Sequence, residues 1–279
     1  MDYSIVVPAR NEEGSLRALY EATKGVCEAM GGSWELIFID DGSTDRTYEI
    51  LTDLCEKDSH VKMIRFRRSF GQTAGWSAGF SAASGDIVIV MDADLQNDPK
   101  DIPAMVEKLK REHCDVISGW RKDRKDTSML KIGSKIGNWV RKKVTGEKIH
   151  DQGCSLKVYR KEALEDLELY GEMHRYITAL LSWKGFRIGE MVVRHHAREH
   201  GVTNYSIKKK LKGFLLGGTL GTLWLFRIIA LAGRSTPLLA VLLVLLGFQF
   251  LLAGVLADIV AHTYYAQKKP YSIKETKGF

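Results

Sequence analysis

Short apolar runs alternate with amphipathic stretches over residues 1–120. The runs rich in β-branched residues predict five strands, at 3–9, 34–40, 61–66, 86–92 and 115–120. Helical patterns at 13–30 and 44–57 separate the first three runs. Strands that alternate with helices of this length predict right-handed βαβ units, so we expect an α/β fold with a mostly parallel sheet covered by helices on both faces.

Polar segments follow the predicted strands, where the carboxyl ends of parallel strands collect ligands. These segments read PARNEE, DDGSTD, RRSFG and DADLQ. Some of their residues have a structural explanation, because Ser43, Thr44 or Asp45 can cap the next helix and the acids of NEEG complement a helix dipole. Capping leaves Asp40 and Asp41 without a role.

The pair Asp92 and Asp94 is the strongest chemical signal. In an extended segment the two side chains point the same way, and two carboxylates so close repel each other unless a cation lies between them. Mg²⁺ or Mn²⁺, bound by one or two carboxylates and by substrate phosphates, suits this arrangement. An EF-hand calcium loop is disfavoured, because its glycine and later glutamate are missing.

Composition narrows the class of protein. A chain of 279 residues with 45% hydrophobic content can form one large α/β domain with an appendage. Its four cysteines are far apart, which argues against a zinc site or a disulfide framework and favours reduced thiols in the cytosol. The apolar run at 3–8 lacks a basic leader and does not resemble a signal peptide.

The net charge of +7 is concentrated in basic clusters at 65–68, 121–143 and 208–212. Such clusters suit a nucleic acid, an anionic membrane or a phosphorylated substrate. No motif or aromatic interleaving supports nucleic-acid binding, so we expect none.

The composition becomes strongly apolar after residue 211. Residues 237–261 carry one ionisable side chain, Asp258, and are long enough for a transmembrane helix of about 20 residues. A buried core helix is disfavoured by the hydrophobicity on all sides. Residues 206–233 contain Arg227 and several glycines, so they can span the bilayer or lie at its interface. Lysines on both sides favour a hairpin with cytoplasmic ends.

We therefore expect three parts: a cytosolic domain at 1–205, a membrane-associated region at 206–264 and a basic cytosolic tail at 265–279. The protein is expected at the cell membrane, with the first part on the cytosolic face.

Several motifs together resemble the family 2 glycosyltransferases with the GT-A fold, and more narrowly the polyprenyl-phosphate sugar synthases such as dolichol-phosphate mannose synthase and the undecaprenyl-phosphate glucosyltransferases. The motifs are IVVPARNEEGSL, IFIDDGSTDRT, SFGQTAGWSAGFSAASGDIVIVMDADLQNDPKDIP and DQGCSLKVYRKEAL. The resemblance covers residues 3–212. It implies inverting transfer of a hexose from a nucleotide-diphosphate sugar, UDP- or GDP-linked, to the phosphate of a membrane polyprenol.

The resemblance also implies roles for individual residues. It places the metal on Asp92, Asp94 and Gln96, and the acceptor phosphate on Arg121 and Lys131. The residues it assigns to the donor nucleotide are Pro8, Arg10, Glu12, Ile39, Asp41, Ala93 and Arg198.

Asp151 matches the family's proposed catalytic base. Without the resemblance it reads as a turn residue beside Gly153. Because the second pKa of a phosphate monoester is about 6, the acceptor is already largely dianionic at neutral pH, and Asp151 can orient it instead of removing a proton.

The sequence departs from the family pattern in two places. In the basic segment that contains Arg198 and Gly201, Asn204 replaces the usual lysine. The C-terminal region is also shorter than an interfacial segment followed by two spans. Homo-oligomers occur among relatives of this type.

Two other functions compete with sugar transfer to a lipid. A processive polysaccharide synthase is disfavoured, because a QxxRW-like motif and a large transmembrane bundle are both missing from the sequence. A non-catalytic, membrane-anchored nucleotide-sugar binding protein is disfavoured by the intact set of Asp92, Asp94, Gln96 and Asp151.

Overall fold

The computed structural model describes residues 1–122, 149–165, 167–169, 171–196 and 271–279, with residues 242, 245–250, 252–254, 256–257 and 260. The chain divides into two compact units. The first comprises Met1–Gly201 together with Lys269–Phe279, and the second comprises Val202–Lys268. The residues that carry the candidate chemistry belong to the first unit.

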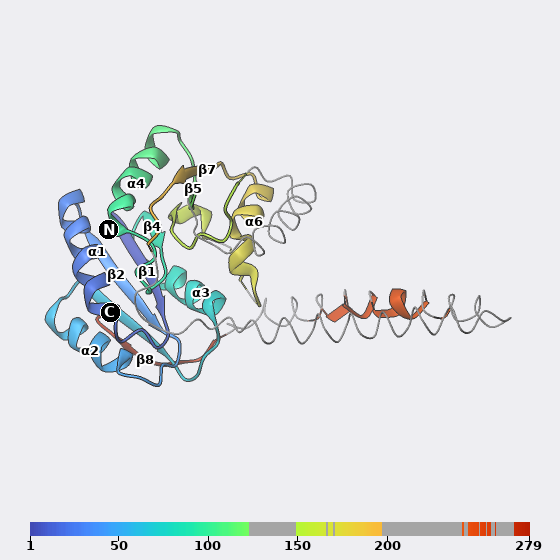
Figure 1. The fold of residues 1–279 in the computed structure, drawn as a ribbon, viewed down its shortest axis with the longest axis horizontal. Helices are drawn as coiled ribbons and strands as arrows, with labels where there is room; N and C mark the ends of the chain where they lie inside the picture. The colour runs from blue at the N-terminus through green and yellow to red at the C-terminus, as the bar shows by residue number, and fades with distance from the viewer. Residues whose placement is uncertain are drawn as a thin grey trace. The chain divides into compact units, whose positions relative to one another are not determined.

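The first unit is built on one eight-stranded sheet with the order β7-β5-β6-β4-β1-β2-β3-β8 (Figure 1). The strands are β1 (Tyr3–Ala9), β2 (Trp34–Asp40), β3 (Val61–Phe66), β4 (Ile87–Val90), β5 (Val116–Trp120), β6 (Lys157–Arg160), β7 (Ile188–Val192) and β8 (Ile273–Lys277). The predicted α/β class and its first five strands are confirmed. The sheet is mixed, because β6 runs antiparallel to β4 and β5 and β8 runs antiparallel to β3.

Helices cover both faces of this sheet. The helices α1 (Leu16–Met30), α2 (Thr47–Lys57) and α4 (Ile102–Arg111) share one core, and α3 (Gln72–Ala82) and α6 (Ile177–Trp183) share the other. Short 3₁₀ turns lie at Pro99–Asp101, Lys161–Ala163 and Met173–Tyr176. In β1, Ile5 and Val7 enter the first core and Val6 enters the second, which explains why these strands read as unbroken apolar runs.

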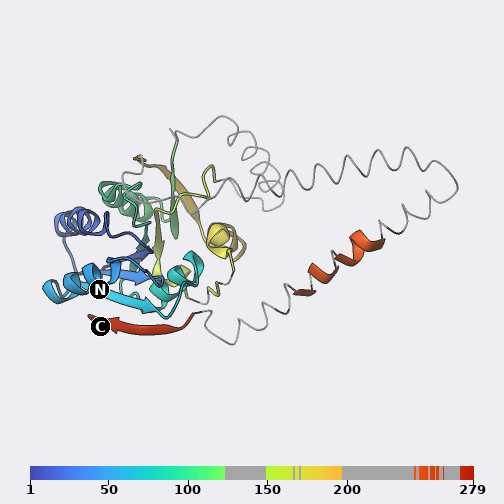
Figure 2. The same ribbon diagram turned by 60° about the horizontal axis from the view of Figure 1, so that its bottom comes forward.

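The C-terminal residues 271–279, expected as a basic tail, contain the edge strand β8. Figure 2 shows this strand along the outer edge of the sheet, where it pairs with β3 in the register Arg65↔Glu275. The chain therefore returns to the first unit after the apolar region.

The described residues of the second unit, between 242 and 260, are all helical. Within the described part of the chain, no helix combines the length and the apolar character needed to cross a membrane. Most of the predicted region 206–264 lies outside the described residues.

Helix α3 lies unusually close to β1, because two of its glycines face the sheet. A Cβ atom at Gly75 would lie 3.1 Å from Cβ of Pro8, and one at Gly79 would lie 2.2 Å from Cγ1 of Val6. This close approach fixes the position of Gln72, the first residue of α3, at the carboxyl edge of the sheet.

We predict that Gly79→Ala destabilises the protein by about 1–3 kcal/mol, because overpacking against Val6 outweighs the gain in helix propensity of about 1 kcal/mol. Gly25→Ala in α1 is the matched control, since a Cβ there meets nothing within 4 Å, and it should raise stability slightly. Thermal unfolding of both variants measures the difference. Equal shifts in Tm would contradict the role assigned to Gly79.

Candidate active site

The loops that follow β1, β2, β3 and β4 meet at the carboxyl edge of the sheet, as the sequence predicted. Asp41 follows β2 and is buried, and its carboxylate accepts hydrogen bonds from Ser69 Oγ (2.7 Å), Phe70 N (2.6 Å) and Gly71 N (3.0 Å). The carboxylate thus organises the loop after β3. The family resemblance assigns Asp41 to the donor nucleotide, and in the structure its carboxylate oxygens accept hydrogen bonds from this loop.

Asp92 and Asp94 follow β4. Asp94 is buried, Asp92 is half-buried, and Gln72 Nε2 donates to Asp92 Oδ1 at 2.6 Å. Leu95 has a φ of 60°, in the left-handed region that non-glycine residues seldom adopt, and Gln96 N donates back to Asp94 Oδ1 at 3.1 Å. The backbone is therefore turned sharply at the point where the two acids are presented.

The pKa of Asp92 reflects the closeness of the two acids. Burial, and after it the charge of Asp94, raises the pKa of the Asp92 carboxyl above its ordinary value. A hydrogen bond from Ser155 and the charges of Lys157 and Arg121 act in the opposite direction. A cation beside Asp92 would consequently stabilise the ionised form of its carboxyl group.

The donor set suits a hard divalent cation that keeps open positions. Among the described residues no three His, Cys, Asp or Glu side chains form a group that could hold a metal ion. Asp92, Asp94 and the amide of Gln96 offer only part of a coordination shell, which fits Mg²⁺ or Mn²⁺ completed by water and by the phosphates of a substrate.

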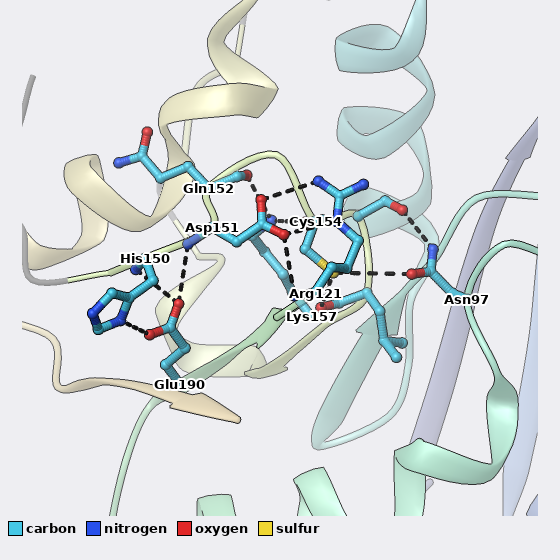
Figure 3. Close-up of polar contacts among 10 residues, drawn as sticks. Asn97, Arg121, His150, Asp151, Gln152, Cys154, Lys157 and Glu190 are labelled. Atoms are coloured by element: carbon cyan, nitrogen blue, oxygen red, sulfur yellow. Dashed lines mark hydrogen bonds and ion pairs between the residues drawn. The ribbon is translucent and has the colours of Figure 1, made fainter. Parts of the chain in front are cut away.

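Asp151 and Arg121 form a two-point ion pair (Figure 3). Arg121 Nε lies 2.7 Å from Asp151 Oδ2, Arg121 Nη2 lies 3.0 Å from Oδ1, and the backbone N–H of Arg121 donates to Oδ2 at 3.2 Å. Both side chains are largely buried. Gly153 allows this approach, because a Cβ atom there would lie 3.1 Å from Arg121 Nη2.

This pair makes Asp151 a poor base. Although burial raises the pKa of the Asp151 carboxyl, the hydrogen bonds and charge of Arg121 outweigh it and hold that pKa below its ordinary value. A carboxylate with a depressed pKa and both oxygens engaged is suited to orienting Arg121, whose charge also acts on Asp92.

Glu190 on β7 fixes the backbone that carries Asp151 (Figure 3). Its Oε1 accepts hydrogen bonds from His150 N (2.8 Å) and Asp151 N (3.1 Å), and its Oε2 lies 2.7 Å from His150 Nδ1. The His150 ring also stacks on Trp120, with centroids 4.4 Å apart. Arg121 follows Trp120 directly, so the same contacts hold both members of the ion pair.

Lys157 is an almost fully buried cation beneath this site. Its ammonium donates to the carbonyl oxygens of Gln152 (3.2 Å) and Cys154, which closes the turn after Asp151. Burial lowers the pKa of this ammonium, while the carboxylates of Asp151 and Asp92 act in the opposite direction. Lys157 thus links the turn after Asp151 to the acids after β4.

The segment after β7 is tied to the acidic loop. Arg194 Nη2 lies 2.8 Å from Asp101 Oδ1, His196 N donates to Gln96 O at 2.9 Å, and Asn97 pairs with His195 in an isolated bridge. These contacts carry the chain from the sheet toward Arg198. Arg198 and Lys131 themselves lie outside the described residues.

The other predicted donor-site residues occupy different surroundings. Arg10 is exposed, and Glu12 Oε2 accepts from Ser15 Oγ at 3.1 Å. Ile39 and Ala93 are buried in the two cores, and Pro8 is half-buried against α3. Their assignment to the nucleotide stays a prediction.

Four residues of the site were missed in the sequence, namely Gln72, Lys157, Glu190 and Arg194. Lys157 and Glu190 did leave a signal, because each is a charged residue inside a run that otherwise reads as a strand. Gln72 and Arg194 left none, since their partners depend on contacts between distant segments.

Comparison with known proteins shows the family to which the chain belongs. A family model described as "Glycosyl transferase family 2" matches residues 4–168. "Dodecaprenyl-phosphate galacturonate synthase" of Rhizobium johnstonii is 38% identical over 301 residues, which cover 95% of this chain and 89% of that protein. "Undecaprenyl-phosphate 4-deoxy-4-formamido-L-arabinose transferase" of Pectobacterium carotovorum is 33% identical over 290 residues, which cover 94% of this chain and 88% of that protein.

A solved structure is similar in fold. Glucosyl-3-phosphoglycerate synthase from Mycobacterium tuberculosis, in complex with Mn²⁺ and uridine-diphosphate-glucose, matches 75% of this chain and 73% of its own with a TM-score of 0.56 and 18% identity. The family match and the two relatives agree with the resemblance seen in the motifs. The chain therefore belongs to the family 2 glycosyl transferases.

Proposed function

We propose that this glycosyltransferase moves a hexose, with inversion, from a nucleotide-diphosphate sugar to the phosphate of a membrane polyprenol. The observation that carries the proposal is the extent of the likeness to the two relatives whose names specify a polyprenyl phosphate, because each aligns with 94–95% of the chain. The likeness therefore extends beyond the sheet domain into the apolar C-terminal region.

On the donor side, Asp92, Asp94 and Gln96 would hold Mg²⁺ or Mn²⁺. Such an ion supplies positive charge to the leaving nucleoside diphosphate when it is bound. Gln72 fixes the orientation of Asp92 by its hydrogen bond. Asp41 serves the nucleoside pocket by shaping the Ser69–Gly71 loop, alongside the other proposed donor residues Pro8, Arg10, Glu12, Ile39, Ala93 and Arg198.

On the acceptor side, Arg121 would bind the phosphate, with Lys131 as a second cation. Asp151 holds the Arg121 guanidinium in place through two contacts of 2.7 and 3.0 Å, so its role is to orient. A phosphate dianion is itself the nucleophile, which removes the need for a protein base near neutral pH.

The exposure of apolar side chains supports a membrane setting. Apolar side chains are exposed on the described helical residues of the second unit: Leu242, Leu245, Leu246, Phe248, Phe250, Leu252, Leu256 and Val260. Large apolar side chains exposed in this number are typical of a membrane or protein contact.

The return of the chain as β8 bears on the number of membrane crossings. The segment up to His196 and the strand β8 both belong to the first unit, so any crossing between them occurs an even number of times. We therefore favour a hairpin, formed by residues 206–233 and 237–261, with the sheet domain on the cytosolic face.

The reaction is tested with full-length protein in detergent, undecaprenyl phosphate and Mn²⁺ or Mg²⁺. Radiolabelled UDP-glucose, UDP-N-acetylglucosamine, UDP-galacturonate and GDP-mannose are offered in parallel. We expect label to enter the lipid phase with one of these donors only when the metal is present. Metal-dependent donor binding without any lipid-linked product would contradict the proposed acceptor.

Asp94→Ala should lower kcat/KM by at least about 10²-fold and abolish metal-dependent nucleotide binding, because one of two carboxylate ligands is lost. Asp86→Asn is the control, since Asp86 is exposed and lies just before the opposite end of β4. Isothermal titration calorimetry and the transfer assay measure the two effects. Retention of metal-dependent binding in Asp94→Ala would remove the metal role.

Asp151→Asn should retain nucleotide binding and slow transfer about 10- to 100-fold through loss of the charge that orients Arg121. The pKa of Asp151 lies below its ordinary value, so this group stays ionised throughout the working range. We therefore expect kcat/KM for the acceptor to rise near pH 6 in both proteins, with ionisation of the phosphate. A wild-type rate that persists at pH 5 and is lost selectively in Asp151→Asn would identify Asp151 as a base.

A further inference from the structure

The two residues just before β8 contact the base of the loop that Asp41 organises. Arg67 N donates to Ser272 O at 3.0 Å, and the Tyr271 ring stacks on Phe66 with centroids 5.1 Å apart. Phe66 in turn meets Phe70 edge to face at 5.7 Å. Tyr271 therefore reaches the Ser69–Gly71 loop through one intervening ring.

A second route runs from the middle of β8. Tyr48 donates its hydroxyl to Glu275 Oε2 at 2.9 Å, and the Arg65 guanidinium lies over the Tyr48 ring, 3.7 Å from its centroid. Arg65 Nε lies 3.3 Å from Asp40 Oδ2. Glu275 thus fixes the Tyr48 ring. Arg65, which pairs with Asp40, stacks on that ring.

Asp40 depends on that partner because its carboxylate is fully buried. Its Oδ1 accepts from Ser43 N at 2.8 Å and closes the turn Asp40–Ser43. A buried carboxylate that loses its cation is strongly unfavourable, so displacement of Arg65 would disturb this turn.

The two loops have no room to move independently. Gly42 has a φ of 65°, and a Cβ atom there would lie 2.6 Å from the carbonyl carbon of Arg68. Asp41, the neighbouring residue, binds Ser69, Phe70 and Gly71. A shift at Phe66 or Arg65 is therefore transmitted to the whole edge that follows β2 and β3.

We infer that Tyr271 and Glu275 are positioning residues for the donor-nucleotide pocket. They act through Phe66 and Arg65. The C-terminal segment 271–279 thereby supports the donor site. The inference rests on the proposed function, because that function places the nucleotide at these loops. A chain that ends before 271 should consequently bind nucleotide poorly even though residues 2–196 remain.

The test measures binding of UDP and of GDP, each with MnCl₂, to the full chain in detergent by calorimetry. The nucleotide that binds the wild-type protein becomes the probe. Glu275→Leu should weaken its binding about tenfold, because Tyr48 loses its acceptor and Arg65 its support. Glu275→Gln keeps an acceptor oxygen and should bind within about twofold of wild type.

Tyr48→Phe supplies a double-mutant cycle, because it removes only the hydroxyl and keeps the ring under Arg65. Combined with Glu275→Leu, it should add little further loss, since both changes break the same hydrogen bond. Lys274→Gln and Thr276→Ala are matched controls on exposed residues of the same strand and should bind normally. The KM for undecaprenyl phosphate should stay unchanged in every variant, which a general loss of structure would not allow.

Wild-type affinity in Glu275→Leu would overturn the inference and leave the proposed function standing. Additive losses in the double variant would overturn the route through Tyr48. Absence of binding of either nucleotide to the wild-type protein would instead overturn the proposed function, and the inference with it.

Discussion

Asp92 and Asp94 lie together after the end of β4, where burial and the charge of Asp94 raise the free energy of the ionised Asp92. The neighbouring residues reduce that cost. Gln72 donates to Asp92, Gln96 donates to Asp94, and Lys157 contributes a buried positive charge. Because these groups come from α3, the loop after β4 and β6, the position of each element is constrained by the pair.

The other acids at this edge are compensated by the protein itself. Asp40 pairs with Arg65, and Asp151 pairs with Arg121. Asp41 accepts hydrogen bonds from the backbone N–H groups of the Ser69–Gly71 loop. For Asp92 the compensation is partial, since the pKa of its carboxyl remains raised. This difference is the chemical reason for proposing the divalent cation at this pair and not at the other acids named here.

Local patterns predicted the strands β1 to β5 and the position of the acids, because both depend on period-two hydrophobicity and on where a strand ends. They did not predict β8, whose pairing with β3 joins residues more than 200 positions apart, as in Arg65 and Glu275. The antiparallel strand β6 was also missed, since its four residues, Lys157–Arg160, include a charged residue at each end. The ion pair of Arg121 with Asp151 could not be read from sequence, because the family motifs assign the two residues separate roles.

That ion pair also bears on how two anionic substrates are kept apart. An unpaired Arg121 would attract any phosphate, including the diphosphate of the donor. While it stays bound to Asp151 in a largely buried place, its guanidinium is partly neutralised, so it attracts a further anion strongly only when that anion carries more than one negative charge. The terminal phosphate of a lipid acceptor, with about two negative charges, meets that condition, whereas each bridged phosphate of a metal-bound diphosphate carries less. Under the proposed function, this arrangement would direct the donor to the carboxylate pair and the acceptor to Arg121.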